Sequence, residues 1–218
     1  MCNQPHVTQS TLYNRLFAHF YDSFMADIEK QVLLPKRKHL LSGLQGHILE
    51  VGAGTGINFS FYQPETNVLA VEPSGAMLRF AQQKAQEAQA SIQLLQMKVG
   101  DKRLKGRVPT EGFDAIVCTL VLCSTSEPEA VIALLYKWLK PGGKVVILEH
   151  IQESGGWRKN FNQFINPLWK FFGQGCDLTR RTDLYLKQAG FKAEYETYFQ
   201  TGLYFYEALL IKAKERRV

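Results

Sequence analysis

A glycine-rich loop with an acidic residue at its start is the part of the chain whose chemistry is clearest. Glycines stand at positions 52, 54 and 56, and Glu50 lies two positions before the first of them. Glycine lets the backbone turn sharply and lets a ligand approach main-chain atoms closely. A dinucleotide loop would have its third glycine three positions after the second, and a P-loop would end in Gly-Lys-Ser or Gly-Lys-Thr. Because a carboxylate repels pyrophosphate but accepts hydrogen bonds from an ammonium group, the loop indicates a ligand with a positive centre.

Two further carboxylates follow segments that we expect to be strands. Glu72 comes eighteen residues after Gly54, and Asp101 follows Gly100. An acidic side chain at the end of the second strand accepts hydrogen bonds from both hydroxyls of a ribose in α/β nucleotide sites. Since parallel strands end at the same edge of a sheet, we expect Glu50, Glu72 and Asp101 to line that edge. A ligand with a positive centre, a ribose and an adenine fits them.

The elements that must position these residues alternate between apolar runs and helical patterns, which is typical of a parallel sheet. The strands are expected at 47–51, 67–71, 91–97, 113–120 and 144–149. The helices are expected after a Ser74 cap and at 127–139, 157–172 and 179–189. Two last segments, 191–199 and 203–211, have the spacing of an antiparallel hairpin. We therefore predict an α/β fold with a doubly wound, mostly parallel sheet closed by an antiparallel C-terminal hairpin.

Length and composition favour one domain that folds alone, because 45% of the 218 residues are hydrophobic. We expect an N-terminal helical cover at 1–46, a cofactor-binding core at 47–150, and a lid segment, a helix and the closing hairpin at 151–218. The chain has a net charge of +6, and two stretches, 98–107 and 212–217, carry +4 and +3 of it against a balance of slightly negative charge elsewhere. No basic stretch is interleaved with aromatics, so we expect no nucleic-acid partner. No apolar run reaches the length of a membrane span and no secretory signal is visible, so we expect a cytoplasmic protein.

The four cysteines show neither a Cys-x-x-Cys pair nor the Cys/His spacing of a zinc site, so we expect reduced thiols and no metal. Cys118 is expected inside the fourth strand, and Cys123 is expected to be a small buried residue rather than a nucleophile. His150 follows the fifth strand. Two interpretations stay open for it, a catalytic base that reaches the ligand and a structural hydrogen bond.

The order of these motifs resembles that of the class I S-adenosylmethionine-dependent methyltransferases. The matching motifs between about residues 46 and 150 are E-V-G-A-G-T-G, V-E-P, G-D, F-D-A-I-V-C-T-L-V-L and L-K-P-G-G-K, and T-R-R-T-D-L-Y-L-K-Q-A-G-F precedes the hairpin. Within that superfamily C-T-L-V-L-C-S, L-E-H and G-C-D-L-T-R are most similar to methyltransferase-like proteins of the alkyl thiol methyltransferase type. They are also similar to bacterial quinone and phospholipid methyltransferases. Glu72 stands where many members have Asp, which keeps the ribose-binding chemistry.

The resemblance implies S-adenosyl-L-methionine as methyl donor, S-adenosyl-L-homocysteine as product, and no metal. The glycine loop would cradle the methionine part, with Glu50 at its ammonium group, and Glu72 would hold the ribose. Asp101 would approach the adenine amino group, and Leu120 with Val121 would lie beneath the sulfonium. The implied cofactor-binding residues are Glu50, Gly52, Ala53, Gly54, Thr55, Gly56, Asn58, Glu72, Pro73, Met77, Gly100, Asp101, Leu120 and Val121. Of these, Pro73 and Met77 would flank the adenine, and His150 is the implied catalytic residue.

The aromatic content of residues 13–24 and 157–180 indicates a cover over a small apolar or amphipathic acceptor. A thiol is the first candidate acceptor. The alternatives are a quinone, a phospholipid headgroup, and a cofactor-binding protein without turnover. The chain shows no apolar N-terminal leader like the one that anchors the alkyl thiol methyltransferases to membranes. We therefore expect a cytoplasmic location, and we leave peripheral membrane contact and the oligomeric state open.

Overall fold

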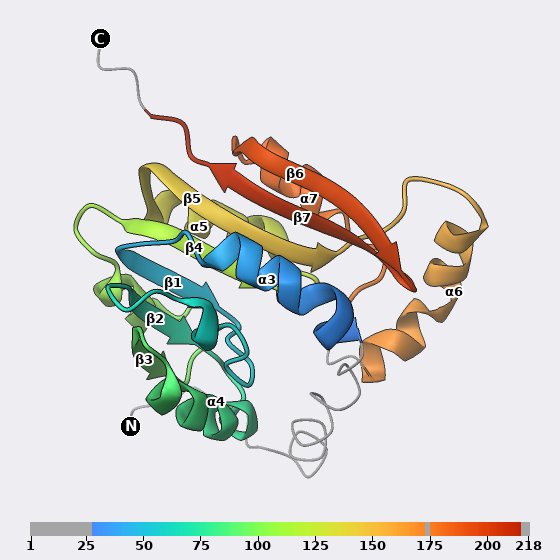
Figure 1. The fold of residues 1–218 in the computed structure, drawn as a ribbon. Helices are drawn as coiled ribbons and strands as arrows, with labels where there is room; N and C mark the ends of the chain where they lie inside the picture. The colour runs from blue at the N-terminus through green and yellow to red at the C-terminus, as the bar shows by residue number, and fades with distance from the viewer. Residues whose placement is uncertain (1–27, 173–174, 215–218) are drawn as a thin grey trace, which may run out of the picture. The chain divides into compact units, whose positions relative to one another are not determined.

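The computed structural model describes residues 28–172 and 175–214 (Figure 1). The chain divides into two compact units, residues 1–105 and residues 106–218, and each is described by itself. The expected aromatic helix around residues 13–24 lies outside the described residues. The prediction that the whole chain forms one domain, with a cover, a core and a lid segment, stays a prediction.

The first unit contains three parallel strands in the order β3-β2-β1. They are β1 (His47–Val51), β2 (Asn67–Val71) and β3 (Ser91–Leu95). The register places Glu50 opposite Ala70 and Val51 opposite Val71. Four of the five residues in both β1 and β2 are buried, as expected for strands covered on both faces. The first two strands have the predicted bounds, while β3 ends at Leu95, two residues before the predicted end.

Helices of the first unit begin with a π-helical segment, η1 (Glu29–Leu33), which continues into α3 (Leu34–Leu41). The 3₁₀ segments are η2 (Phe59–Phe61) and η3 (Lys102–Arg107). The predicted Ser74 cap is confirmed, because its hydroxyl accepts a hydrogen bond from the Met77 amide at the start of α4 (Gly75–Glu87). This helix buries its apolar face through Ala76, Met77, Leu78 and Ala81.

The second unit contains four strands in the order β4-β5-β7-β6. They are β4 (Phe113–Thr119), β5 (Leu139–His150), β6 (Lys192–Thr201) and β7 (Leu203–Ile211). The β4–β5 pair is parallel, and β7 pairs antiparallel with both β5 and β6. The predicted hairpin is confirmed (Figure 1), but its turn is tighter than expected. Thr201 pairs with Leu203 around Gly202, whose φ of 73° suits glycine.

Two boundaries in the second unit differ from the prediction by more than two residues. The strand β5 begins at Leu139 instead of Lys144, directly after α5 (Pro128–Trp138). Phe113 pairs with Leu139 and Ala115 pairs with Lys144, so Pro141 and two glycines lie in an irregularity of the ladder, where a missing amide is tolerated. The helix α7 (Thr182–Gln188) begins later than the predicted Thr179, because the Asp177 carboxylate holds the Thr179 amide and hydroxyl in a local turn.

The helix α6 (Trp157–Phe172) has the predicted bounds. Helical spacing groups Asn166 with the polar side chains of this helix, yet Asn166 is buried, because its side-chain amide binds the Asp177 carboxylate and the Leu178 amide. The apolar face instead points outward through Trp157, Phe161, Phe164, Leu168 and Phe171, which are all exposed. No helix in the described part of the chain is long and apolar enough to cross a membrane.

Replacing Phe164 by Ala should change the free energy of unfolding by no more than about 0.5 kcal/mol, because 85% of its surface is already in water. The matched control is Phe205→Ala in β7, where a ring that is 2% exposed should cost about 3–5 kcal/mol. Urea denaturation of both variants measures the difference. A Phe164→Ala cost as large as that of Phe205→Ala would mean that the outer face of α6 is covered in solution.

Candidate functional site

The glycines of the loop after β1 have different structural roles. Gly52, Gly54 and Gly56 all have positive φ, at 67°, 57° and 77°. A Cβ on Gly56 would lie 2.6 Å from the Phe59 ring and 3.2 Å from the Ala81 Cα, so this glycine lets the loop pack closely. A Cβ on Gly54 would meet nothing within 4 Å. The backbone at Gly54 therefore borders open space, as a loop that cradles a ligand should.

Glu72 is attached to this loop, which brings together two residues that the sequence placed in one site. Its Oε2 accepts a hydrogen bond from the Gly54 amide at 3.0 Å, and its Oε1 accepts one from the Ser74 amide at 2.8 Å. The side chain is buried, and burial raises the pKa of its carboxyl group. Each carboxylate oxygen has a second lone pair, so both oxygens can still accept from ribose hydroxyls.

Glu50 is 2% exposed, and both of its oxygens have buried partners. Asn58 Nδ2 donates to one oxygen at 2.9 Å and the Tyr62 hydroxyl donates to the other at 2.7 Å. Burial raises the pKa of the carboxyl group to about 7, against the lowering effects of these hydrogen bonds and of Arg37. An ammonium group close to this carboxyl would favour its ionised form.

The network continues from Asn58 to an ion pair that the sequence analysis missed. Arg37 Nη1 donates to Asn58 Oδ1 at 2.8 Å. The same guanidinium binds Glu29 through two hydrogen bonds, Nε to Oε1 at 2.6 Å and Nη2 to Oε2 at 3.3 Å. Both side chains are buried, so the two charges compensate each other inside the unit. Glu29 lies in the π-helical segment η1, and π-helical turns occur frequently near functional sites.

Asp101 is placed beside a basic side chain of its own loop. Arg103 binds it with Nη2 at 2.7 Å from Oδ2, and the Arg103 amide donates to Oδ1 at 2.9 Å. The hydrogen bond from the guanidinium is the main reason that the pKa of Asp101 falls to about 2. The contact between Asp101 and an adenine stays a prediction. Gly100, directly before it, has a φ of 90° and makes the turn after β3.

The remaining predicted residues of the first unit have mixed environments. Thr55 is buried, and its hydroxyl accepts a hydrogen bond from Lys84 Nζ at 3.3 Å. Met77 is buried on α4, whereas Pro73 is exposed. Ala53 is buried, and its amide donates to the Val71 carbonyl at 3.1 Å. These contacts keep the loop in place, and a role of each residue at the cofactor stays a prediction.

In the second unit, the loop after β4 contains a strained residue. Leu120 has a φ of 56° and is the one non-glycine residue with positive φ among those that the structure describes. Such a conformation costs about 1–3 kcal/mol and clusters at functional sites. The buried Glu149 carboxylate supports the loop by accepting hydrogen bonds from the amides of Val121 at 2.7 Å, Leu122 at 2.8 Å and Cys123 at 3.4 Å. The place of Leu120 and Val121 beneath a sulfonium stays a prediction.

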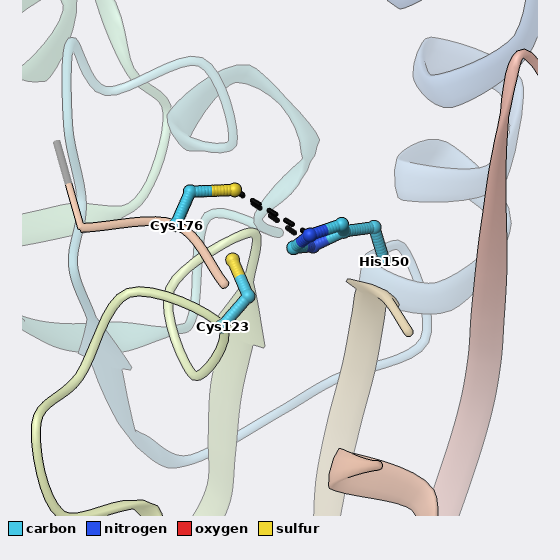
Figure 2. Close-up of side chains that lie close together, drawn as sticks. All are labelled: Cys123, His150 and Cys176. Atoms are coloured by element: carbon cyan, nitrogen blue, oxygen red, sulfur yellow. Dashed lines mark hydrogen bonds between the residues drawn. The ribbon is translucent and has the colours of Figure 1, made fainter. Parts of the chain in front are cut away.

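A second group of chemically active side chains lies in this unit, and Figure 2 shows it. Cys176 Sγ is 3.5 Å from His150 Nε2, and Trp169 Nε1 donates to the same sulfur at 3.3 Å. Hydrogen bonds from Cys123 and then from His150 hold the pKa of the Cys176 thiol below its usual range. His150 thus has a structural contact, and its role as a base stays a prediction. No spacing signal could have found Cys123, His150 and Cys176 as a group, because His150 is 27 positions after Cys123 and 26 before Cys176.

Comparisons with known proteins define the class of this protein. The N1-methyltransferase of 1,6-didemethyltoxoflavin from Burkholderia thailandensis, solved with S-adenosylhomocysteine, superposes with a TM-score of 0.65 over 98% of this chain and 92% of its own at 15% identity. The predicted Rossmann-like methyltransferase fold, a mostly parallel sheet with an antiparallel C-terminal hairpin, is therefore confirmed.

The family follows from the sequence comparisons. A family model described as a methyltransferase domain matches residues 17–196 and so includes residues of both units. Human thiol S-methyltransferase TMT1B is 35% identical over 69% of this chain and 63% of its own length, and human TMT1A is 30% identical over 84% of this chain and 78% of its own. The chain belongs to the S-adenosylmethionine-dependent methyltransferase family. It spans somewhat less than two thirds of TMT1B.

The two glycines give a matched pair of variants. Gly54→Ala should cost about 1–2 kcal/mol of stability from backbone strain. It should also weaken binding of S-adenosylhomocysteine, because the methyl group of the alanine enters the open space beside the loop. Gly56→Ala should cost about 1–3 kcal/mol more, because the added methyl group also meets the Phe59 ring. Denaturation curves and calorimetric titrations separate the effects. An equal loss of stability in both variants would contradict the difference in packing.

The raised pKa of Glu50 predicts a dependence of stability on pH. Below about pH 4.5 the carboxyl is protonated in both states, and between about 4.5 and 7 the folded state keeps a proton that the unfolded chain has lost. Stability from this group therefore falls as pH rises through that window, by about 3 kcal/mol in total. Glu50→Gln should remove this loss, so its stability relative to the unchanged protein should rise between pH 4.5 and 7.

The control for this experiment is Glu87→Gln on the exposed end of α4, which should follow the unchanged protein at every pH. Denaturation at a series of pH values measures all three proteins. A difference between Glu50→Gln and the unchanged protein that stays constant with pH would show that folding does not raise the pKa of Glu50.

Proposed function

We propose that this protein transfers the methyl group of S-adenosyl-L-methionine to a small apolar or amphipathic thiol. The main support for binding of this donor is the hydrogen bond from the Gly54 amide to the Glu72 carboxylate, beside open space at that glycine. The acceptor is proposed from the two human relatives, which are thiol S-methyltransferases at 30–35% identity.

The first unit offers groups of the right kind to each part of the donor. The open glycine loop fits the methionine backbone, and the carboxylate of Glu72 fits the two ribose hydroxyls. Glu50, with a pKa of about 7, gains from a neighbouring ammonium group because the positive charge offsets the cost of a buried carboxylate. Since Asn58 and Tyr62 fix this carboxylate, its orientation exists before a ligand arrives.

The methyl group of a sulfonium is already a strong electrophile, so the protein contributes mainly by positioning and by excluding water. In the transfer, a bond forms between the acceptor sulfur and the methyl carbon while the bond from that carbon to the donor sulfur breaks. A thiolate needs no base, whereas a hydroxyl or ammonium acceptor must lose a proton. A thiol acceptor is thus consistent with a His150 ring that already contacts Cys176.

The experiment uses the purified chain, radiolabelled donor, and separate panels of alkyl thiols, reduced quinones and phosphatidylethanolamine vesicles. Label should pass to the thiols. Label on quinols or phosphatidylethanolamine alone would show that the acceptor is not a thiol. Binding of the donor without transfer to any panel would indicate a cofactor-binding protein without turnover.

Glu72→Ala should weaken binding of S-adenosylhomocysteine by about 1–3 kcal/mol, because the ribose loses a charged acceptor. Glu87→Ala, on the exposed end of α4, is the matched control and should bind as the unchanged protein does. Isothermal titration calorimetry measures both. Unchanged affinity in a folded Glu72→Ala variant would remove Glu72 from the donor site.

A further inference from the structure

Three side chains with soft donor atoms meet in the second unit, and neither the family nor the proposed function accounts for them. Cys123 lies in the turn after β4, His150 ends β5, and Cys176 follows α6. Their sulfur and nitrogen atoms all lie within 4.8 Å of one another. In Figure 2 the Cys176 sulfur points at the His150 ring, with Cys123 beside them.

The contact between Cys176 and His150 has the spacing of a tetrahedral metal site. Zinc binds thiolate sulfur at about 2.3 Å and histidine nitrogen at about 2.0–2.1 Å, so the sulfur and nitrogen of a tetrahedral site are about 3.5–3.6 Å apart. The distance from Cys176 Sγ to His150 Nε2 is 3.5 Å. Two cysteines and one histidine are also a known ligand set for zinc sites that keep one position open.

The backbone around the cluster holds the ligands in place. The Asp177 amide donates to the Cys123 carbonyl at 3.0 Å, which joins the segments that contain the two cysteines. Arg180 Nη1 donates to the Leu122 carbonyl at 2.8 Å and strengthens the same connection. The Glu149 carboxylate accepts a hydrogen bond from the Cys123 amide at 3.4 Å. Ligands fixed in this way before a metal arrives lose little conformational entropy on binding.

A hydrogen bond to one of the sulfurs completes the resemblance to a metal centre. Trp169 Nε1 donates to Cys176 Sγ at 3.3 Å. Metal ligands are commonly oriented by such outer hydrogen bonds. Both cysteines are at least partly shielded from solvent, with Cys123 only 2% exposed. The surroundings are therefore drier than those of a surface pair of thiols.

We propose that Cys123, His150 and Cys176 bind one soft divalent metal ion of the zinc type and leave a fourth coordination position for a thiolate. Binding releases to solvent the protons of the cysteine thiols that still hold them. A thiol that enters the fourth position gives up its proton in the same way and becomes a thiolate. This last step rests on the proposed function, because it would supply the acceptor in its reactive form, whereas the metal site itself does not.

The test titrates the metal-free chain with Co²⁺ and then with Zn²⁺, under a reductant that contains no thiol. Co²⁺ should bind with one equivalent per chain, with intense sulfur-to-cobalt absorption and the visible bands of a tetrahedral ion, and Zn²⁺ should displace it. A chain that binds neither ion with this stoichiometry would overturn the proposal.

Cys123→Ser, His150→Ala and Cys176→Ser should each weaken Zn²⁺ binding by more than about tenfold, a loss that even outer hydrogen-bond partners can cause. Cys118→Ala is the matched control, because it removes a buried thiol of the neighbouring strand outside the cluster and should leave the affinity unchanged. Circular dichroism checks that each variant folds. Folded variants of the cluster that bind as the unchanged protein does would show that the ion sits elsewhere.

Ethanethiol added to the Co²⁺-loaded chain tests the open position. Further sulfur-to-cobalt absorption should appear, and an unchanged spectrum would show that no thiolate enters. Methyl transfer to thiols is assayed separately. Metal binding without thiol methylation would defeat the proposed function and leave the site, while thiol methylation by a chain that binds no metal would defeat the site alone.

Discussion

The buried carboxylate of Glu50 is the constraint on which the first unit depends. A carboxyl group removed from water costs several kcal/mol unless hydrogen bonds and opposite charge compensate it. Here Asn58 and Tyr62 bind it, Asn58 in turn binds Arg37, and Arg37 binds Glu29. The glycine loop begins two residues after Glu50. Its position is therefore fixed by a chain of polar contacts that extends back to the π-helical segment before α3.

The second unit uses a buried carboxylate differently. Glu149 binds backbone amides of the turn after β4 and thereby compensates for the strained conformation of Leu120. The same turn contains Cys123, so the Glu149 side chain supports both the strained Leu120 and the segment of Cys123. In both units a glutamate near the end of a strand is held by hydrogen bonds beside a loop that we predict to lie at the donor. Positional accuracy at such sites comes from these supporting contacts as much as from the residues that touch a ligand.

How much the sequence predicts depends on whether the signal is local. An apolar run that ends in glycines gave β1, and a second run broken by Glu72 and Pro73 gave β2, both with their observed bounds. Ser74 was found from capping preference alone. The start of β5 was missed because Pro141 ordinarily ends a regular element. The burial of Asn166 was missed because helical spacing cannot show the distant Asp177 that satisfies its amide. The contact of Arg37 with Asn58, 21 positions away, is made only by the fold. The same holds for the cluster of Cys123, His150 and Cys176, so no short window of sequence shows either group.

The different surroundings of Gly54 and Gly56 have a consequence for how this family can diverge. Position 56 is constrained by the packing of Phe59 and Ala81, so every descendant that keeps the fold should keep glycine there. Position 54 is open, and asparagine or aspartate tolerates its positive φ better than other side chains do. A descendant that lost its methyl donor would be free to place such a residue at 54 alone. With Gly54 at the donor, as we propose, a chain with glycine at both positions would retain donor binding, and a chain with glycine at 56 alone would retain only the fold.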